Sequence, residues 1–106
     1  MEHYTFKYDE RLTIELPELQ LEWSAYSTIE REAIVTRWEL IRGTIPEKIK
    51  QFERLINVKQ EQLNTESHFP TSCLLNWEIA ELASRINDLH LWFRKNQGID
   101  EGKSHR

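Results

Sequence analysis

Cysteine and glycine are scarce in this chain of 106 residues. The single cysteine, Cys73, has no partner in the chain, so an intramolecular disulfide is excluded and the fold must rest on packing. The three glycines, Gly43, Gly98 and Gly102, are too few and too dispersed for a glycine-rich phosphate loop, which excludes the common nucleotide motifs. A reducing cytoplasm is the compartment that we expect.

Long apolar runs and an excess of positive charge are also missing. No stretch approaches the ~18 apolar residues of a membrane span, and the N-terminal sequence MEHYTFKYDE lacks the features of a signal peptide. The net charge is -4, and residues 1–30 carry seven acidic side chains against two basic ones. Because nucleic-acid binders normally present a basic stripe, neither a membrane nor a nucleic acid is an expected partner.

The chain nevertheless has enough apolar and aromatic residues for one core. Hydrophobic residues make up 39% of it, and four Trp, three Tyr and four Phe exclude a disordered chain. We expect a single helical domain over residues 1–97, including an N-terminal arm over residues 1–26, and a flexible tail over residues 98–106. The general look is that of short, acidic bacterial proteins, but no motif matches a named family.

Apolar side chains alternate in the N-terminal arm, and this is the period of a β-strand. With Asp9-Glu10 as the connecting loop, the arm is predicted to be a short β-hairpin or an extended arm. Residues 17–26 are left open between a third strand and a short helix, and Pro17 followed by Glu18 favours the helix. The alternating positions are Tyr4, Phe6, Tyr8, Leu12, Ile14 and Leu16.

Three later segments have helical spacing with start and stop signals. Ser27 and Glu30 form a capping box before the first helix, and Gly43 is suited to the left-handed conformation that closes one. Pro70 and its polar neighbours favour a loop of about seven residues before the last helix. The helices are predicted at about 28–42, 46–64 and 72–97.

The second and third predicted helices each carry a continuous apolar strip, with spacings of four and three in alternation. Lys59 is the one interruption, and Leu55 and Val58 widen the strip of the second helix. Two helices of this kind should lie antiparallel, with the first helix and the arm on their shared groove. The predicted fold class is therefore mainly α: a three-helix antiparallel bundle preceded by the hairpin. The strips are Ile45, Ile49, Phe52, Ile56 and Leu63, then Leu75, Ile79, Leu82, Ile86, Leu89 and Phe93.

Titratable residues form no familiar catalytic or metal-binding arrangement. Cys73 has His68 five residues upstream but no third group to orient the pair, and His90 is expected to be a boundary residue. Glu81, Arg85 and Asp88 have the spacing of a solvent-exposed ladder of ion pairs. We therefore expect no enzyme activity, no cofactor and no metal.

Three apolar residues on the last helix point away from its strip. Trp77 and Trp92 are roughly 100° to 160° round the helix from it, on the polar side, and Leu74 joins them. Such surface must be covered either by the arm or first helix, or by a partner chain. We predict an interaction surface at these three residues, and a small non-enzymatic protein-protein interaction domain of unknown pathway that self-associates as a homodimer.

The alternative function is a nucleic-acid-binding or transcriptional regulatory protein that uses the first two helices. Their short connection is compatible with a helix-turn-helix. The second helix carries four basic side chains, but three glutamates are interleaved with them, so its surface is nearly neutral. These residues are Lys48, Lys50, Arg54, Lys59, Glu47, Glu53 and Glu61.

Overall fold

The computed structural model describes residues 3–95 and is mainly helical, with an antiparallel β-hairpin at its N-terminus. This part of the predicted fold class is confirmed. The predicted last turn of the C-terminal helix, residues 96–97, and the predicted tail, residues 98–106, lie outside the described residues. The elements are β1 (Tyr4–Asp9), β2 (Ile14–Leu19), the short 3₁₀-helix η1 (Trp23–Ala25), α1 (Thr28–Arg42), α2 (Ile45–Thr65) and α3 (Phe69–Phe93).

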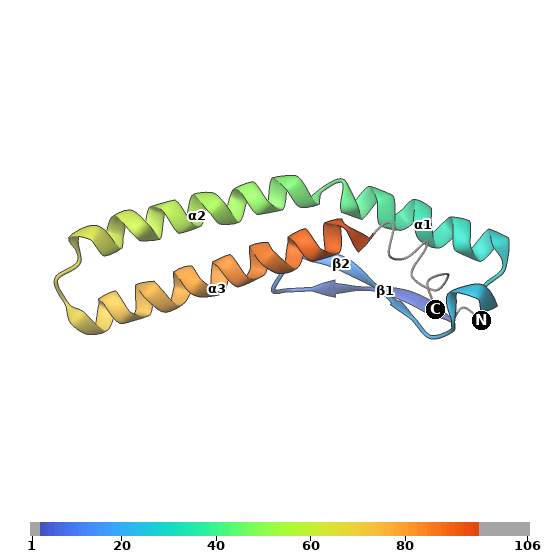
Figure 1. The fold of residues 1–106 in the computed structure, drawn as a ribbon, viewed down its shortest axis with the longest axis horizontal. Coiled ribbons are helices and arrows are strands. Elements are labelled where there is room, and N and C mark those ends of the chain that lie inside the picture. The colour runs from blue at the N-terminus through green and yellow to red at the C-terminus, as the bar shows by residue number, and fades with distance from the viewer. Residues whose placement is uncertain (1–2, 96–106) are drawn as a thin grey trace.

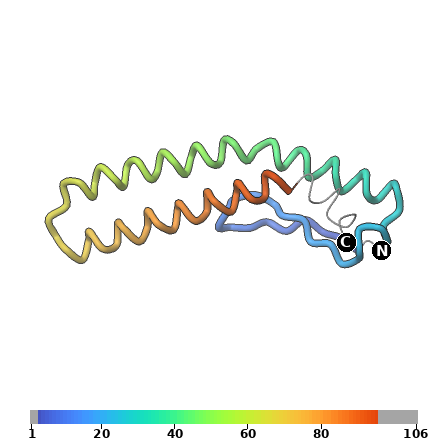
Figure 2. The backbone as a smooth tube through the Cα atoms, viewed as in Figure 1, coloured from blue at the N-terminus to red at the C-terminus, as the bar shows by residue number. Residues whose placement is uncertain are grey.

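The helices do not form the predicted three-helix antiparallel bundle. Figure 1 shows that α1 continues along the line of α2, so that the two make one long, bent helix, and that α3 alone returns beside α2. The β-hairpin lies under α1 and extends to the C-terminal half of α3, as the tube in Figure 2 also shows. The molecule is consequently elongated, with principal extents of 59 × 27 × 21 Å.

The backbone at the α1–α2 junction explains why the chain does not reverse. Gly43 has φ −64° and ψ −18°, so the prediction that it would adopt the left-handed conformation is wrong. Thr44 is also right-handed, and its backbone N–H donates to the carbonyl of Ile41 at 2.9 Å. Pro46 has no N–H to donate to the carbonyl of Arg42, so the helix bends here.

The predicted hairpin is present, with a longer turn than Asp9-Glu10. The two strands pair from Tyr4↔Leu19 to Asp9↔Ile14, which leaves residues 10–13 as the turn. The carboxylate of Asp9 accepts from the backbone N–H of Leu12 at 2.8 Å and supports it. Beyond the turn, β2 runs through Pro17 and η1 follows, so the segment left open by the sequence is part strand and part 3₁₀-helix.

The core lies where the hairpin, α1, the start of α2 and the end of α3 meet. Trp38, Ile34, Ile45 and Leu89 are completely buried there. The hydroxyl of the buried Tyr26 donates to the carbonyl of His3 and accepts from the backbone N–H of Gln20 at 3.0 Å, which fastens the open end of the hairpin. The core is therefore concentrated in one half of the molecule.

The other half is a two-helix arm, which we call the distal arm (residues 55–79). Leu75 is its most deeply buried side chain. Lys59, the interruption in the apolar strip of α2, donates to the carboxylate of Glu78 on α3 at 2.9 Å. A single polar pair of this kind favours the observed alignment of the two helices, because a shift along their axes would separate these two charges.

The seam between α2 and α3 can be tested with one leucine pair. Leu82→Ala removes a side chain that is only 6% exposed and should lower the free energy of unfolding by about 2 to 5 kcal/mol. Leu91→Ala, on the same helix but 45% exposed, should cost well under half as much. Urea unfolding of both variants measures the difference, and equal losses would show that the wrong face of α3 has been assigned to the seam.

The turn of the hairpin offers a test of backbone strain. Thr13 has φ 62°, a left-handed conformation that a β-branched residue rarely adopts. Thr13→Gly should raise the free energy of unfolding by about 1 kcal/mol, because glycine adopts this conformation without a steric penalty. Thr5→Gly, at an exposed position in β1, should lower it by ~0.5 to 1 kcal/mol. Destabilisation by both changes in thermal unfolding would contradict this account of the turn.

Candidate interaction surface

One face of α3, which we call its outer face, carries both predicted tryptophans and two of the acidic residues. Leu74, Trp77, Glu81, Asp88 and Trp92 recur on it at intervals of three, four and seven residues. The hairpin lies against the C-terminal half of this face, whereas the half nearer the α2–α3 loop extends past the hairpin turn (Figure 1). The two halves therefore have different environments.

Arg11, in the hairpin turn, is fastened to the outer face of α3. Its guanidinium donates to the carboxylate of Glu81 at 3.0 Å, to that of Asp88 at 2.6 Å and to the hydroxyl of Ser84 at 2.7 Å. The predicted ladder is thus present only in part, since Glu81 also pairs with Arg85 at 3.5 Å whereas Asp88 pairs with Arg11. Glu81 and Asp88 thus help to align the hairpin turn on α3.

Arg11, Glu81 and Asp88, which we call the Arg11 cluster, are close enough for their contacts to shift the pKa values of Glu81 and Arg11. The hydrogen bond from Arg11 lowers the pKa of the Glu81 carboxyl below its ordinary value, because it favours the ionised form. The hydrogen bonds to Asp88 and Glu81 raise the pKa of the Arg11 guanidinium in turn. Both side chains remain about one third exposed, so solvent screens the attraction.

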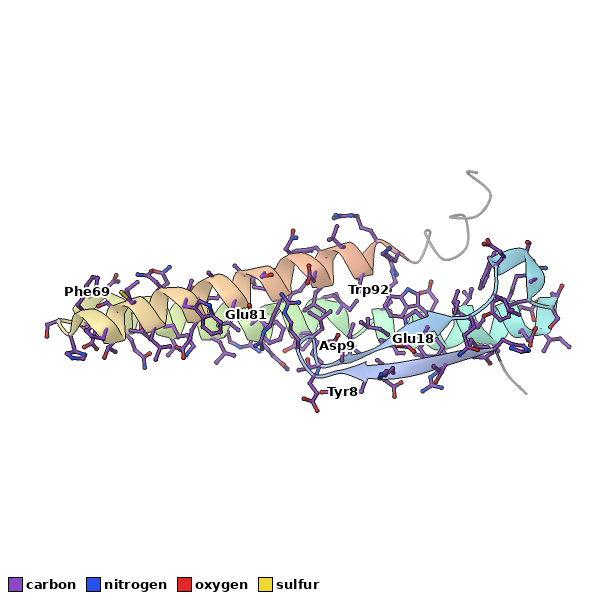
Figure 3. All side chains as sticks on the ribbon, turned by 90° about the horizontal axis from the view of Figure 1, so that it is seen from below. Tyr8, Asp9, Glu18, Phe69, Glu81 and Trp92 are labelled. Carbon is purple, nitrogen blue, oxygen red and sulfur yellow. The ribbon has the colours of Figure 1, made fainter. Side chains whose placement is uncertain are left out.

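Trp92 lies in the half of the outer face that the chain itself covers. Its ring packs edge to face against the buried Trp38 of α1, with 5.7 Å between ring centroids. It is only partly exposed, and it lies near the hairpin in Figure 3, far from Phe69 at the other end of α3. Fifteen residues separate it from Trp77, or about 22 Å along the helix, so the two tryptophans do not form one patch.

Trp77 and Leu74 lie in the uncovered half and are 63% and 54% exposed. Leu55 and Val58, on α2 of the distal arm, are 47% and 52% exposed. Leu55 and Trp77 line opposite walls of a shallow groove of about 280 Å³, with Leu82 among its other lining residues. We call Leu55, Val58, Leu74 and Trp77 the distal apolar surface.

Three residues of the candidate interaction surface and its surroundings were not identified as site residues from the sequence. Leu55 and Val58 were expected to pack within the bundle, but among the described elements only α3 lies beside this part of α2 (Figure 2). Arg11 was overlooked as well. The available signal was a basic residue in an otherwise acidic arm, together with two carboxylates seven residues apart on one face of a helix.

The other candidate residues are not brought together. Cys73 is exposed, and Nδ1 of His68 lies 2.9 Å from the hydroxyl of Thr71. His90 is exposed beside a shallow apolar groove that Ile49 and Phe93 also line. Within residues 3–95, no group of three or more His, Cys, Asp or Glu side chains is placed to hold a metal ion. No helix in this part of the chain has the length and apolar character to cross a membrane.

Comparison of the chain with known protein families, with curated proteins and with solved structures found no match. The distal apolar surface must therefore be interpreted from its own chemistry. Its four residues carry no charge, and the nearby Lys59 and Glu78 neutralise each other. Such a surface is suited to burial against another protein.

The Arg11 cluster makes the stability of the fold pH-dependent in a defined direction. Because the pKa of Glu81 is lowered in the folded state, its stabilising contribution is present above the ordinary glutamate pKa of about 4.3 and is lost as the pH falls through the lowered value. Arg11→Gln should therefore lower the melting temperature at pH 7, and the difference from the wild type should shrink in acid.

Lys50→Gln is the control for this experiment, because Lys50 is an exposed cation on α2. Thermal unfolding of the wild type and both variants from pH 7 to about pH 3 spans the titration of glutamate. A difference between the wild type and Arg11→Gln that stays constant over this range would show that Arg11 acts through packing alone.

Proposed function

We propose that this protein is a small, non-enzymatic protein-protein interaction domain of the cytoplasm that self-associates through its distal apolar surface. The observation that carries this proposal is the exposure of Leu55, Val58, Leu74 and Trp77 on a two-helix arm, where Leu55 and Trp77 line one groove. A helix pair buries one seam between its members, and its other apolar faces need a further layer. On the distal arm, a second copy supplies this layer.

The size of the surface is compatible with weak association. The exposed parts of its four side chains amount to roughly 400 Å², if a large aromatic side chain contributes about 150–250 Å² when fully exposed. A stable interface typically buries about 800 Å² on each partner, with an apolar centre and a polar rim. The distal apolar surface can form such a centre, and we expect a dissociation constant in the micromolar range.

The alternative, nucleic-acid binding through α1 and α2, receives less support from the charges. Four of the seven basic residues on α1 and α2 are paired with acidic residues, which reduces the positive field that non-specific binding requires. The pairs are Arg37–Glu15, Arg42–Glu39, Arg54–Glu47 and Lys59–Glu78. Binding to random duplex DNA that weakens as the salt concentration rises would support this alternative.

Self-association through the distal apolar surface can be tested with Trp77→Gln. Removal of the largest exposed side chain should weaken the dimer at least about tenfold, since hot-spot aromatics commonly contribute more than about 1.4 kcal/mol. Sedimentation velocity over a micromolar concentration series measures the change. In the wild type, tryptophan emission should also shift to shorter wavelength as the concentration rises.

Ile29→Gln is the matched control, because Ile29 is 79% exposed on α1, away from the distal arm. It should leave the dissociation constant unchanged. Equal effects of the two substitutions would refute a contact at the distal apolar surface. A wild-type chain that remains monomeric up to ~1 mM, where even weak complexes form, would refute self-association itself.

A further inference from the structure

The two strands of the hairpin leave a row of backbone groups unpaired at each outer edge. The backbone N–H of Gln20 donates to the carbonyl of His3 at 3.0 Å, which marks these two residues as a hydrogen-bonded pair. Such pairs alternate with non-hydrogen-bonded ones along an antiparallel ladder. In the observed register, Tyr4, Phe6 and Tyr8 therefore direct their N–H and C=O groups away from β2.

The outer edge of β2 is closed to another strand. Pro17 pairs with Phe6, so the N–H that it lacks would have pointed outward from the hairpin. β2 also lies beside α1, where Glu15 accepts from the guanidinium of Arg37 at 2.8 Å. Proline and a neighbouring helix are two of the devices that protect an edge strand from pairing.

The outer edge of β1 has neither protection. In the views of Figures 1 and 3, no described element lies along it. Within residues 3–95, no backbone hydrogen bond outside the strand pair involves Tyr4, Phe6 or Tyr8. Thr5 and Lys7 are exposed, and Tyr8 is 57% exposed although its ring is apolar.

We infer that the open edge of β1 binds β1 of a second copy, antiparallel and about a two-fold axis at Phe6, so that two hairpins form one four-stranded sheet. This inference rests on the proposed self-association but places a contact on the hairpin, separate from the distal apolar surface. A four-stranded sheet satisfies more backbone groups than the two-stranded hairpin of a single copy.

The positions of the unpaired backbone N–H and C=O groups of β1 favour pairing with a second copy and determine its register. With Phe6 on the axis, Tyr4 faces Tyr8 of the partner subunit, and all three outward residues both donate and accept, which gives six backbone hydrogen bonds. A register centred on Lys7 would place two lysines opposite each other. A register centred on Thr5 would place Tyr8 opposite position 2, which lies before the start of β1.

The side chains agree with the register centred on Phe6. Lys7 faces Thr5 of the partner subunit, so the like charges are not directly opposite. Asp9 faces His3 of the partner subunit, which brings an acidic group to one that can carry positive charge. The exposed ring of Tyr8 meets the ring of the partner's Tyr4, an aromatic cross-strand pair of the kind that stabilises sheets.

The first test removes one outward N–H without touching the ladder inside the hairpin. Tyr8→Pro and Tyr8→Ala both remove the ring, but only proline removes the N–H that would donate to the second copy. Tyr8→Pro should raise the dimer dissociation constant at least about tenfold above that of Tyr8→Ala. Equal constants for the two variants in sedimentation would overturn the inference.

Lys7→Pro is the control for which backbone N–H groups of β1 point away from β2. The N–H of Lys7 points toward Leu16 in the observed register, so its loss should lower the melting temperature. Tyr8→Pro, by contrast, should leave the circular dichroism spectrum and the melting temperature close to those of Tyr8→Ala. If Tyr8→Pro unfolds the hairpin as Lys7→Pro does, the assignment of the free edge is wrong.

A disulfide test checks the register directly, in a Cys73→Ser background that removes the natural thiol. The Cα atoms of a non-hydrogen-bonded pair lie about 4.5 Å apart, within the range that a disulfide spans. Thr5→Cys with Lys7→Cys should therefore give a reducible covalent dimer on mild oxidation. Thr5→Cys alone should not, and a cross-link through this single change would overturn the register.

The outcome also separates this inference from the proposed function. Dimers weakened by Tyr8→Pro but not by Trp77→Gln would support the β1 contact and count against the distal apolar surface. Dimers weakened only by Trp77→Gln would do the reverse. If a synthetic extended peptide of another sequence binds the monomer while the chain does not pair with itself, the edge is open but the second copy is the wrong occupant, and the inference fails.

Discussion

The right-handed conformation of Gly43 and Thr44 is the constraint on which the rest of the structure depends. Because of this conformation, α2 continues in the direction of α1 instead of folding back beside it. The missing N–H of Pro46 bends the helix at the junction. Within residues 3–95, the α2–α3 pair therefore has no third helix beside it. The β-hairpin takes that place for one half of α3 and leaves the other half without a cover (Figure 1).

The hairpin is held in this position by packing first and by charge second. Leu12 and Ile14, at its turn, are almost completely buried with the side chains of the core, and this burial supplies most of the attraction. Arg11 then determines where along α3 the turn lies. Its planar guanidinium can reach all three oxygen acceptors, which are spaced over two helical turns of α3, from one position only. Partly exposed ion pairs contribute more to alignment than to stability.

The sequence is sufficient to predict features that depend on near neighbours. The capping box of Ser27 and Glu30 is present, the apolar strips of α2 and α3 do meet, and the hairpin forms where side chains alternate. Pro70 was expected in the loop before the last helix, but it lies in the first turn of α3, where a proline loses no hydrogen bond. This is why α3 begins at Phe69, earlier than predicted.

Other features depend on distant residues and could not be predicted in the same way. Gly43 permits either hand of backbone, and its conformation decides the direction of a whole helix. The different environments of Trp77 and Trp92 depend on how far the hairpin reaches along α3, which helical periodicity does not encode. For the same reason, Glu81 and Asp88 could be placed on one face, but their partner in the hairpin turn could not be identified.

The concentration of the core at one end of a 59 Å molecule has a consequence for motion. Segments with few buried apolar contacts open at lower free energy than the global fold. The loop end of α2 and α3, where Leu75 is the one side chain of the distal arm that is nearly buried, can separate transiently while the tryptophan-rich end stays closed. A partner that clamps this end would slow the opening, so binding would tighten the least rigid part of the chain rather than its centre.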